Sequence, residues 1–313
     1  MKDLGELKFF LGIEFTRSEK GIYMSQRKYA LELISELGLA GTKPSSTPLE
    51  VNQKLTSVDF DRLASSSDDS AQDPLLKDAG EYQRLVGRLL YLTMTRPDIS
   101  FAVQTLSQYM HSPKQSHLDA AKRVVKYVKN APGQGLLLPS PGDGTLKAYC
   151  DADWGACLQT RRSVTGYCVF FGNALISWKS KKQDTVARSS AEAEFRSMAS
   201  TAAEIVWLIG LLGELDVKLQ LPVALFCDSK AAIQIAANRI FHERMKHIDI
   251  DCHFIREKIK AGIIKTIHVN TKEQIADMLT KGLGRTQHQH LLCKLGVKNI
   301  FLPSSLRGSI EPG

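Results

Sequence analysis

Hydrophobic and polar positions between about residues 146 and 280 follow the periods of strands and helices in turn. Three short apolar segments with tight links come first, and each later strand is reached through a helical pattern. Consecutive strands with short links predict an antiparallel meander, whereas strands reached through helices add in parallel. We therefore expect an α/β fold with a mixed sheet flanked by helices. The expected strands are 146–150, 165–171, 175–179, 223–227 and 264–269, and the expected helices are 190–212, 229–237, 247–260 and 273–280.

The chain before this domain has a different pattern. Two apolar segments on either side of the turn 18–21 predict a hairpin, and a helical period follows over 26–37. Residues 42–79 are rich in Ser, Pro and Asp, so they bury too little apolar area to order themselves and predict a linker or surface loop. Three helices are then expected at 82–94, 98–109 and 113–129.

These patterns divide the chain into five parts. A small α+β and helical region precedes the α/β domain, and its first piece is too small to form a self-sufficient domain. The last part predicts a helix and an extended tail, to which no chemistry is assigned. The expected boundaries are 1–50, a flexible linker at 51–79, a helical segment at 80–143, the α/β domain at 144–283 and the tail at 284–313.

The composition and the net charge of the chain favour a protein that binds polyanions. The chain has 41 Lys and Arg against 33 Asp and Glu, a formal charge of +8, which assists docking of a nucleic acid and makes it salt-dependent. The longest uninterrupted apolar stretch, Ile205 to Leu212, is too short to span a bilayer, and a secretory leader is not apparent. We expect an intracellular, non-secreted protein, in a cytoplasmic particle or the nucleus, whose six separated cysteines are free thiols.

Acidic residues mark the ends of several predicted elements. Asp151 follows the strand 146–150, Asp228 follows the strand 223–227, and Asp277 lies in a short apolar helix. Each has a simpler interpretation: Asp151 or Asp153 as a turn former, Asp228 as a helix N-cap, and Asp277 as a solvent-facing acid. Their number in one domain nevertheless predicts a shared metal site.

Helical geometry separates two further acids on the helix 190–212. At ~100° per residue, Glu194 lies roughly 50° from the centre of the apolar stripe and Glu192 roughly 110° away. Glu194 therefore borders the buried side. Glu192 is explained by its place in the first turn after Ser189, where a carboxylate complements the helix dipole.

The donor types restrict the metal and the chemistry. Carboxylate oxygens select Mg2+ or Mn2+ over zinc, and the histidines show no metal-ligand spacing. The sequence also lacks a Gly-rich phosphate loop and a nucleophile elbow. A basic segment near the acids supplies candidate phosphate contacts, although a solvated loop explains it equally well. Its residues are Lys179, Lys181, Lys182 and Arg188.

Several motifs together resemble the ribonuclease H region of a plant copia-type retrotransposon Pol polyprotein. Residues 4–13 resemble the end of a reverse transcriptase, which makes 1–50 a thumb-like remnant, and Arg84–Gly87 with Arg96–Ile99 resemble the connection segment. The ribonuclease H motifs are Tyr149–Trp154, Arg162–Tyr167, Trp178–Gln183, Ser189–Phe195, Cys227–Ser229, Lys246–Asp249 and Ala276–Lys281.

The resemblance implies a ribonuclease H-like fold and hydrolysis of the RNA strand of an RNA/DNA hybrid. It implies two Mg2+ or Mn2+ ions held by a D-E-D-D set, and the upstream reverse transcriptase as a partner. The positions that match as catalytic and metal-binding residues are Asp151, Glu194, Asp228 and Asp277.

Two departures from the family pattern matter. A Tyr-x-Asp-Asp run of polymerase acids is absent, so we expect no DNA synthesis from this chain. Cellular ribonucleases H carry a histidine in the loop after the last strand, where this sequence has Asn270–Lys272 and His268 is still within the predicted strand. The sequence leaves a second hypothesis open, a catalytically silent remnant that binds nucleic acid or supports a reverse transcriptase.

Overall fold

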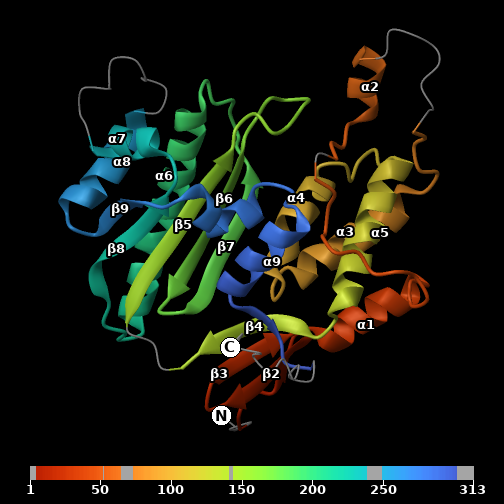
Figure 1. Cartoon of the computed structure of the whole chain (residues 1–313), viewed down its shortest axis with the longest axis horizontal. Helices are drawn as coiled ribbons and strands as arrows, with labels where there is room; N and C mark the ends of the chain where they lie inside the picture. Colours follow the sequence, from red (N-terminus) through yellow and green to blue (C-terminus); the bar gives the residue numbers. More distant parts are fainter. Residues whose placement is uncertain (1–4, 52, 65–72, 141–143, 238–248, 302–313) are drawn as a thin grey trace, which may run out of the picture.

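The computed structural model describes residues 5–51, 53–64, 73–140, 144–237 and 249–301. In this part, two five-stranded sheets lie at different ends of the molecule, and helices pack against both and between them (Figure 1). The first residues of the predicted helix 247–260 lie outside the described residues, as do His242 and His247.

The larger sheet has the strand order β7-β6-β5-β8-β9. β6 pairs antiparallel with β5 and β7, whereas β8 pairs parallel with β5 and β9. The predicted α/β fold, with three antiparallel strands followed by parallel ones, is therefore confirmed. The strands are β5 (Thr145–Asp153), β6 (Val164–Phe171), β7 (Ala174–Lys182), β8 (Gln220–Cys227) and β9 (Ile264–His268).

Alternation along β5 gives this sheet a core on each face. Ala148 and Cys150 belong to the core under helices α6 (Ser190–Glu214), α7 (Lys230–Ala237) and α8 (Asp249–Lys260), while Tyr149 packs in the other core. The second face is covered by η5 (Ile275–Leu279) and α9 (Arg285–Lys294). The helix predicted at 273–280 is in fact two short 3-10 turns, η4 (Thr271–Glu273) and η5, because the chain turns back over the sheet there.

Helix α6 is long and apolar enough to cross a membrane by length and composition, alone among the helices of the described part. Length and composition are weak evidence for a membrane-spanning helix, since the core helix of a soluble protein meets the same criterion. Here α6 packs along β5, β6 and β8, and Phe195, Met198 and Ile205 are fully buried against that sheet.

The smaller sheet, β1-β2-β3-β4-β10, joins segments from both ends of the chain. β4 and β10 were not predicted. β4 pairs closely with β3, since a Cβ at Gly135 would lie 2.1 Å from the carbonyl oxygen of Met24, so this pairing requires glycine. The strands are β1 (Phe9–Phe10), β2 (Ile13–Ser18), β3 (Gly21–Ser25), β4 (Gln134–Pro139) and β10 (Val297–Asn299).

The helical segment and the N-terminal helix share one hydrophobic core. α1 packs on α3 and α5, so the described residues of 1–50 and 80–143 are not separate bodies. Within the predicted linker, residues 58–64 form α2, because the buried ammonium of Lys114 pairs with Asp61 on α2 and with Asp73 at 3.0 Å. The helices are α1 (Arg27–Glu36), α2 (Val58–Ala64), α3 (Ala79–Leu92), η1 (Pro97–Ile99), α4 (Ser100–Ser107) and α5 (Gln115–Asn130).

A buried ion pair lies where this helical core meets α9. Arg96 Nη2 lies 2.8 Å from Asp98 Oδ2, and both side chains are at most 2% exposed. The hydroxyl of Tyr127 donates to the same carboxylate at 2.7 Å, and its ring meets the His288 ring of α9 edge to face at 5.3 Å. The pair therefore connects the helical segment to the element that follows Asp277.

Candidate active site

Asp151 lies inside β5 rather than beyond its end. The strand continues to Asp153 because the backbone pairs with β6 as far as Val164, so neither aspartate forms a turn. The Asp151 side chain is 1% exposed, accepts a short hydrogen bond from the Thr280 hydroxyl, and lies 3.4 Å from Lys281 Nζ. A buried carboxylate in a sheet interior requires such partners.

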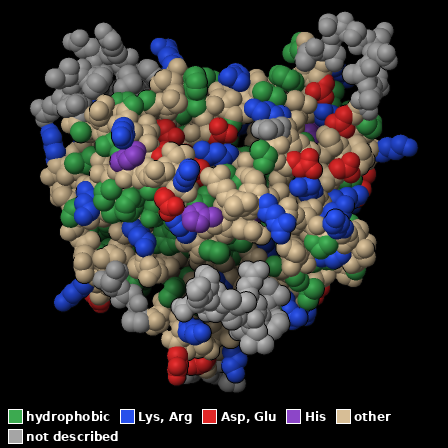
Figure 2. Space-filling view, in the orientation of Figure 1, with side chains coloured by type: hydrophobic (Ala, Val, Ile, Leu, Met, Phe, Trp, Pro, Cys, Tyr) green, Lys and Arg blue, Asp and Glu red, His purple; other side chains and the backbone are tan. Residues whose placement is uncertain are grey.

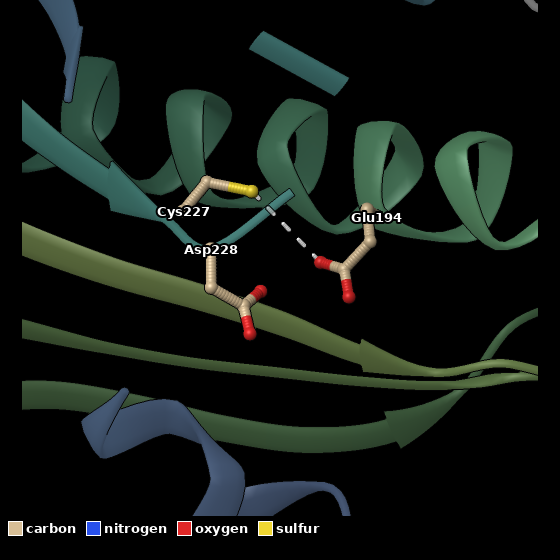
Figure 3. A group of neighbouring side chains, drawn as sticks. All are labelled: Glu194, Cys227 and Asp228. Carbon is tan, nitrogen blue, oxygen red and sulfur yellow. Dashed lines mark hydrogen bonds between the residues drawn. The ribbon is translucent and has the colours of Figure 1, made fainter. Parts of the chain in front are cut away.

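The two acids on α6 have different surroundings, but both are buried: Glu192 is 2% exposed and Glu194 is 9% exposed, so the prediction that Glu192 lies away from the buried side is wrong. Glu192 accepts hydrogen bonds from the backbone N–H of Arg188 at 2.8 Å and from the Arg196 side chain at 2.9 Å. Its own backbone N–H donates to Ser189 Oγ, the N-cap of the helix. Glu192 thus stabilises the start of α6, while Glu194 points toward the end of β8 (Figure 3).

Asp228 follows β8 and lies beside Glu194. Ligating atoms of Glu194, Cys227 and Asp228 all lie within 4.8 Å of one another (Figure 3). The simpler interpretation of Asp228 as a helix N-cap does not hold here, because Ser229 Oγ accepts the hydrogen bond from the Ala232 N–H at the start of α7. The Asp228 carboxylate instead accepts from the Thr271 hydroxyl at 2.9 Å.

Asp277 reaches the same region from η5. Its side chain is buried, and the apolar residues on either side, Ala276 and Met278, anchor the turn in the core. Lys281 Nζ lies 3.0 Å from Asp277 Oδ1, and Gln287 of α9 donates to Oδ2 at 3.5 Å. The simpler interpretation of Asp277 as a solvent-facing acid therefore does not hold.

The electrostatics connect all four carboxylates. Burial, and then the charges of Asp151, Cys227 and Asp228, raise the pKa of Glu194 to about 10. Burial and the Asp151 charge raise the pKa of Asp277 to about 7, against the opposing effect of Lys281, and Asp228 raises it further. Like charges in a buried site disfavour ionisation. When the carboxylates of the site are ionised, they therefore carry more negative charge than its own basic residues neutralise.

This donor set fits a hard divalent cation. Carboxylate oxygens of Glu194 and Asp228 lie close together, and Lys281 joins Asp151 to Asp277, whose Oδ1 is buried without an aligned hydrogen bond. Soft donors also lie nearby: the buried thiol of Cys227 contacts Glu194 Oε2 at 3.9 Å, and the buried thiol of Cys150 lies beside Cys227. All six cysteines are free.

The basic segment lies on β7 and the loop after it. Lys179, Lys181 and Arg188 are exposed, and Lys181 pairs loosely with Asp184 at 3.5 Å. Lys182 instead donates to Gln108 of the helical segment at 2.7 Å, so it is occupied within the protein. Figure 2 shows Lys and Arg side chains spread over the viewed face rather than gathered in one patch.

A sheet of three antiparallel and two parallel strands, with acids on its central strand, on the crossing helix, after β8 and on η5, defines a ribonuclease H-like domain. No family model matches the chain. The Pol polyprotein of transposon RE1 from Arabidopsis thaliana is 43% identical over 96% of this chain, and that of transposon TNT 1-94 from Nicotiana tabacum is 35% identical over 94%. The chain belongs to the family of retrovirus-related Pol polyproteins of transposons, as its motifs predict.

The chain spans about a fifth of the length of these polyproteins: 20% of the first and 22% of the second. It also covers 80% of the uncharacterized mitochondrial protein AtMg00810 of Arabidopsis thaliana, at 42% identity over 66% of this chain.

Solved structures resemble parts of the chain at low sequence identity. The N-terminal ribonuclease H domain of rv2228c from Mycobacterium tuberculosis is 12% identical, with a TM-score of 0.32 over 48% of this chain and 98% of that chain. The foamy viral protease-reverse transcriptase is 11% identical, with a TM-score of 0.47 over 84% of this chain and 37% of that chain. The strand order itself, rather than these scores, carries the assignment of the fold.

Proposed function

We propose that the chain is the ribonuclease H part of its polyprotein and hydrolyses the RNA strand of RNA/DNA hybrids with Mg2+ or Mn2+. The observation that supports this is that Glu194 lies beside Asp228 while Lys281 joins Asp151 to Asp277, and neighbouring acids raise the pKa values of Glu194 and Asp277. Two divalent ions held there would polarise the scissile phosphate and activate water.

The residues of this chain supply position and charge. Thr280 and Lys281 orient Asp151 from one side, while Thr271 orients Asp228 from the other. Thr271 lies in the loop where cellular ribonucleases H place a histidine, so its hydroxyl fixes a carboxylate there instead of supplying a titrating group. Phosphodiester hydrolysis depends mainly on such positioning and on charge neutralisation.

The first test is direct cleavage. Purified protein is incubated with an RNA/DNA duplex labelled on either strand, in Mg2+, in Mn2+ and in chelator. We expect metal-dependent cutting of the RNA strand, with the DNA strand and an RNA/RNA duplex left intact. Binding of the hybrid without any cutting would favour the alternative function, a catalytically silent nucleic-acid-binding remnant.

We also expect hybrid affinity to fall steeply with salt. The double variant Lys179→Gln/Lys181→Gln removes two exposed ammonium groups beside the site, so the slope of log K against log salt should become shallower by roughly 1 to 2. The matched control is Lys265→Gln, an exposed lysine on edge strand β9, which should leave the slope unchanged. Equal slopes in all three proteins, measured by fluorescence anisotropy, would show that β7 does not contact phosphates.

The Pol relatives are about five times as long as this chain. We propose that the hybrid reaches the site from the reverse transcriptase part of such a polyprotein, and that the described residues carry out hydrolysis without DNA synthesis.

A further inference from the structure

A cation of the protein itself lies among the proposed metal ligands. Lys281 Nζ is 3.0 Å from Asp277 Oδ1 and 3.4 Å from Asp151 Oδ2. The backbone fixes this arrangement: the Lys281 N–H donates to the Asp277 carbonyl at 3.1 Å, which turns the two side chains to the same side. Thr280, the residue before it, donates to the same Asp151 oxygen.

The positive charge is confined to one side of the site. Within the described residues, neither Glu194 nor Asp228 has an ion pair with a lysine or arginine; their polar neighbours include the Ala152 backbone, the Cys227 thiol and the Thr271 hydroxyl. In the described part of the chain, the Asp151 and Asp277 carboxylates therefore have a counter-ion that the Glu194 and Asp228 carboxylates lack.

We propose that Lys281 is a built-in counter-ion that holds Asp151 and Asp277 together when metal is absent and opposes binding of a divalent ion on their side. The first ion then binds on the Glu194 and Asp228 side. A second ion at Asp151 and Asp277 requires the ammonium to move away, which the added negative charge of a bound hybrid favours. This inference rests on the proposed metal-dependent function.

The exposure of the side chain supports a movable charge. Lys281 is 34% exposed, unlike its two partners at 2% and 3%, so it can swing toward solvent without unpacking the core.

The test is Mn2+ binding without nucleic acid, by calorimetry, in the wild type and in Lys281→Met, which keeps most of the unbranched side chain and removes the charge. We expect one tight ion in the wild type, and in the variant either a second ion or at least a tenfold gain in affinity. Thermal melting in chelator should show a lower Tm for Lys281→Met, restored by added Mn2+. Lys281→Arg retains the charge and should bind Mn2+ as the wild type does.

The control is Lys272→Met, an exposed lysine on η4, which should change neither readout. Wild-type protein that binds two ions as tightly as Lys281→Met, with equal Tm in chelator, would overturn the role of Lys281 while leaving hybrid cleavage intact. Absence of Mn2+ binding in every variant, together with absence of cleavage, would overturn the proposed function and this inference with it.

Discussion

Replacement of Glu194 with glutamine is expected to lower the rate of hybrid cleavage by at least about a thousandfold. The neutral amide cannot supply the negative charge that holds the metal ions. The substitution preserves the shape of a side chain that is 9% exposed and points toward Asp228. Single-turnover cleavage at saturating protein measures the chemical step without the contribution of binding.

The same substitution is expected to stabilise the metal-free protein. Burial and neighbouring carboxylates raise the pKa of Glu194 from 4.5 to about 10, so the folded state binds a proton that the unfolded state releases above about 4.5. Stability therefore falls as pH rises through that window, and glutamine removes the loss. In chelator at pH 8 we expect a gain on the order of 1–3 kcal/mol, which vanishes toward pH 4.

Glu192→Gln is the matched control, since it lies two positions away on the same helix. Glu192 is buried beside Arg196 and receives the Arg188 N–H, so its replacement should weaken the start of α6 while leaving cleavage within a fewfold of wild type. The opposite pattern, with cleavage lost in Glu192→Gln and retained in Glu194→Gln, would reassign the acid on this helix.

These two glutamates illustrate what the sequence can predict. The helix period places Glu194 at the border of the apolar stripe, because side-chain direction on a helix depends on local spacing. It wrongly leaves Glu192 outside, since that side chain is buried by contacts with Arg196 and the Arg188 backbone that the period does not encode. The antiparallel pairing of the first three strands of the α/β domain and the parallel addition of the later ones followed in the same way from alternation and link length. Both inferences concern contacts between near neighbours in sequence or rules of chain connection.

Contacts between distant segments could not be predicted in this way. Strand β10 has three residues, and its partner β4 lies about 160 positions earlier, so no local period marks their pairing. Asp228 could not be separated from a helix cap by pattern alone, since Ser229, the actual cap, is equally suited to that role. The position of Lys281 at the site depends on a backbone turn that sequence spacing leaves undetermined.

The buried Arg96–Asp98 pair is expected to give the largest stability effect in the chain. Arg96→Met leaves the Asp98 carboxylate buried with only the Tyr127 hydroxyl as a polar partner, which should cost about 3–5 kcal/mol in the free energy of unfolding. Urea denaturation followed by far-UV circular dichroism measures this loss. Tyr127, which donates to Asp98, also contacts His288 of α9, and the neighbouring Gln287 contacts Asp277, so the loss should extend to the catalytic side of the molecule.

A double variant decides whether the loss comes from the unpaired charge or from packing. Arg96→Met/Asp98→Leu removes both charges, so it should recover much of the stability that Arg96→Met loses, because the cost lies in leaving one buried charge without its partner. Arg84→Met is the surface control, since Arg84 and Asp78 are 73% and 70% exposed, and it should cost less than about 1 kcal/mol. The loss in free energy of unfolding of the double variant could instead equal the sum of the losses in Arg96→Met and Asp98→Leu. The guanidinium would then act at this junction through its volume and its hydrogen bond to the Ala131 carbonyl, rather than as the counter-charge of Asp98.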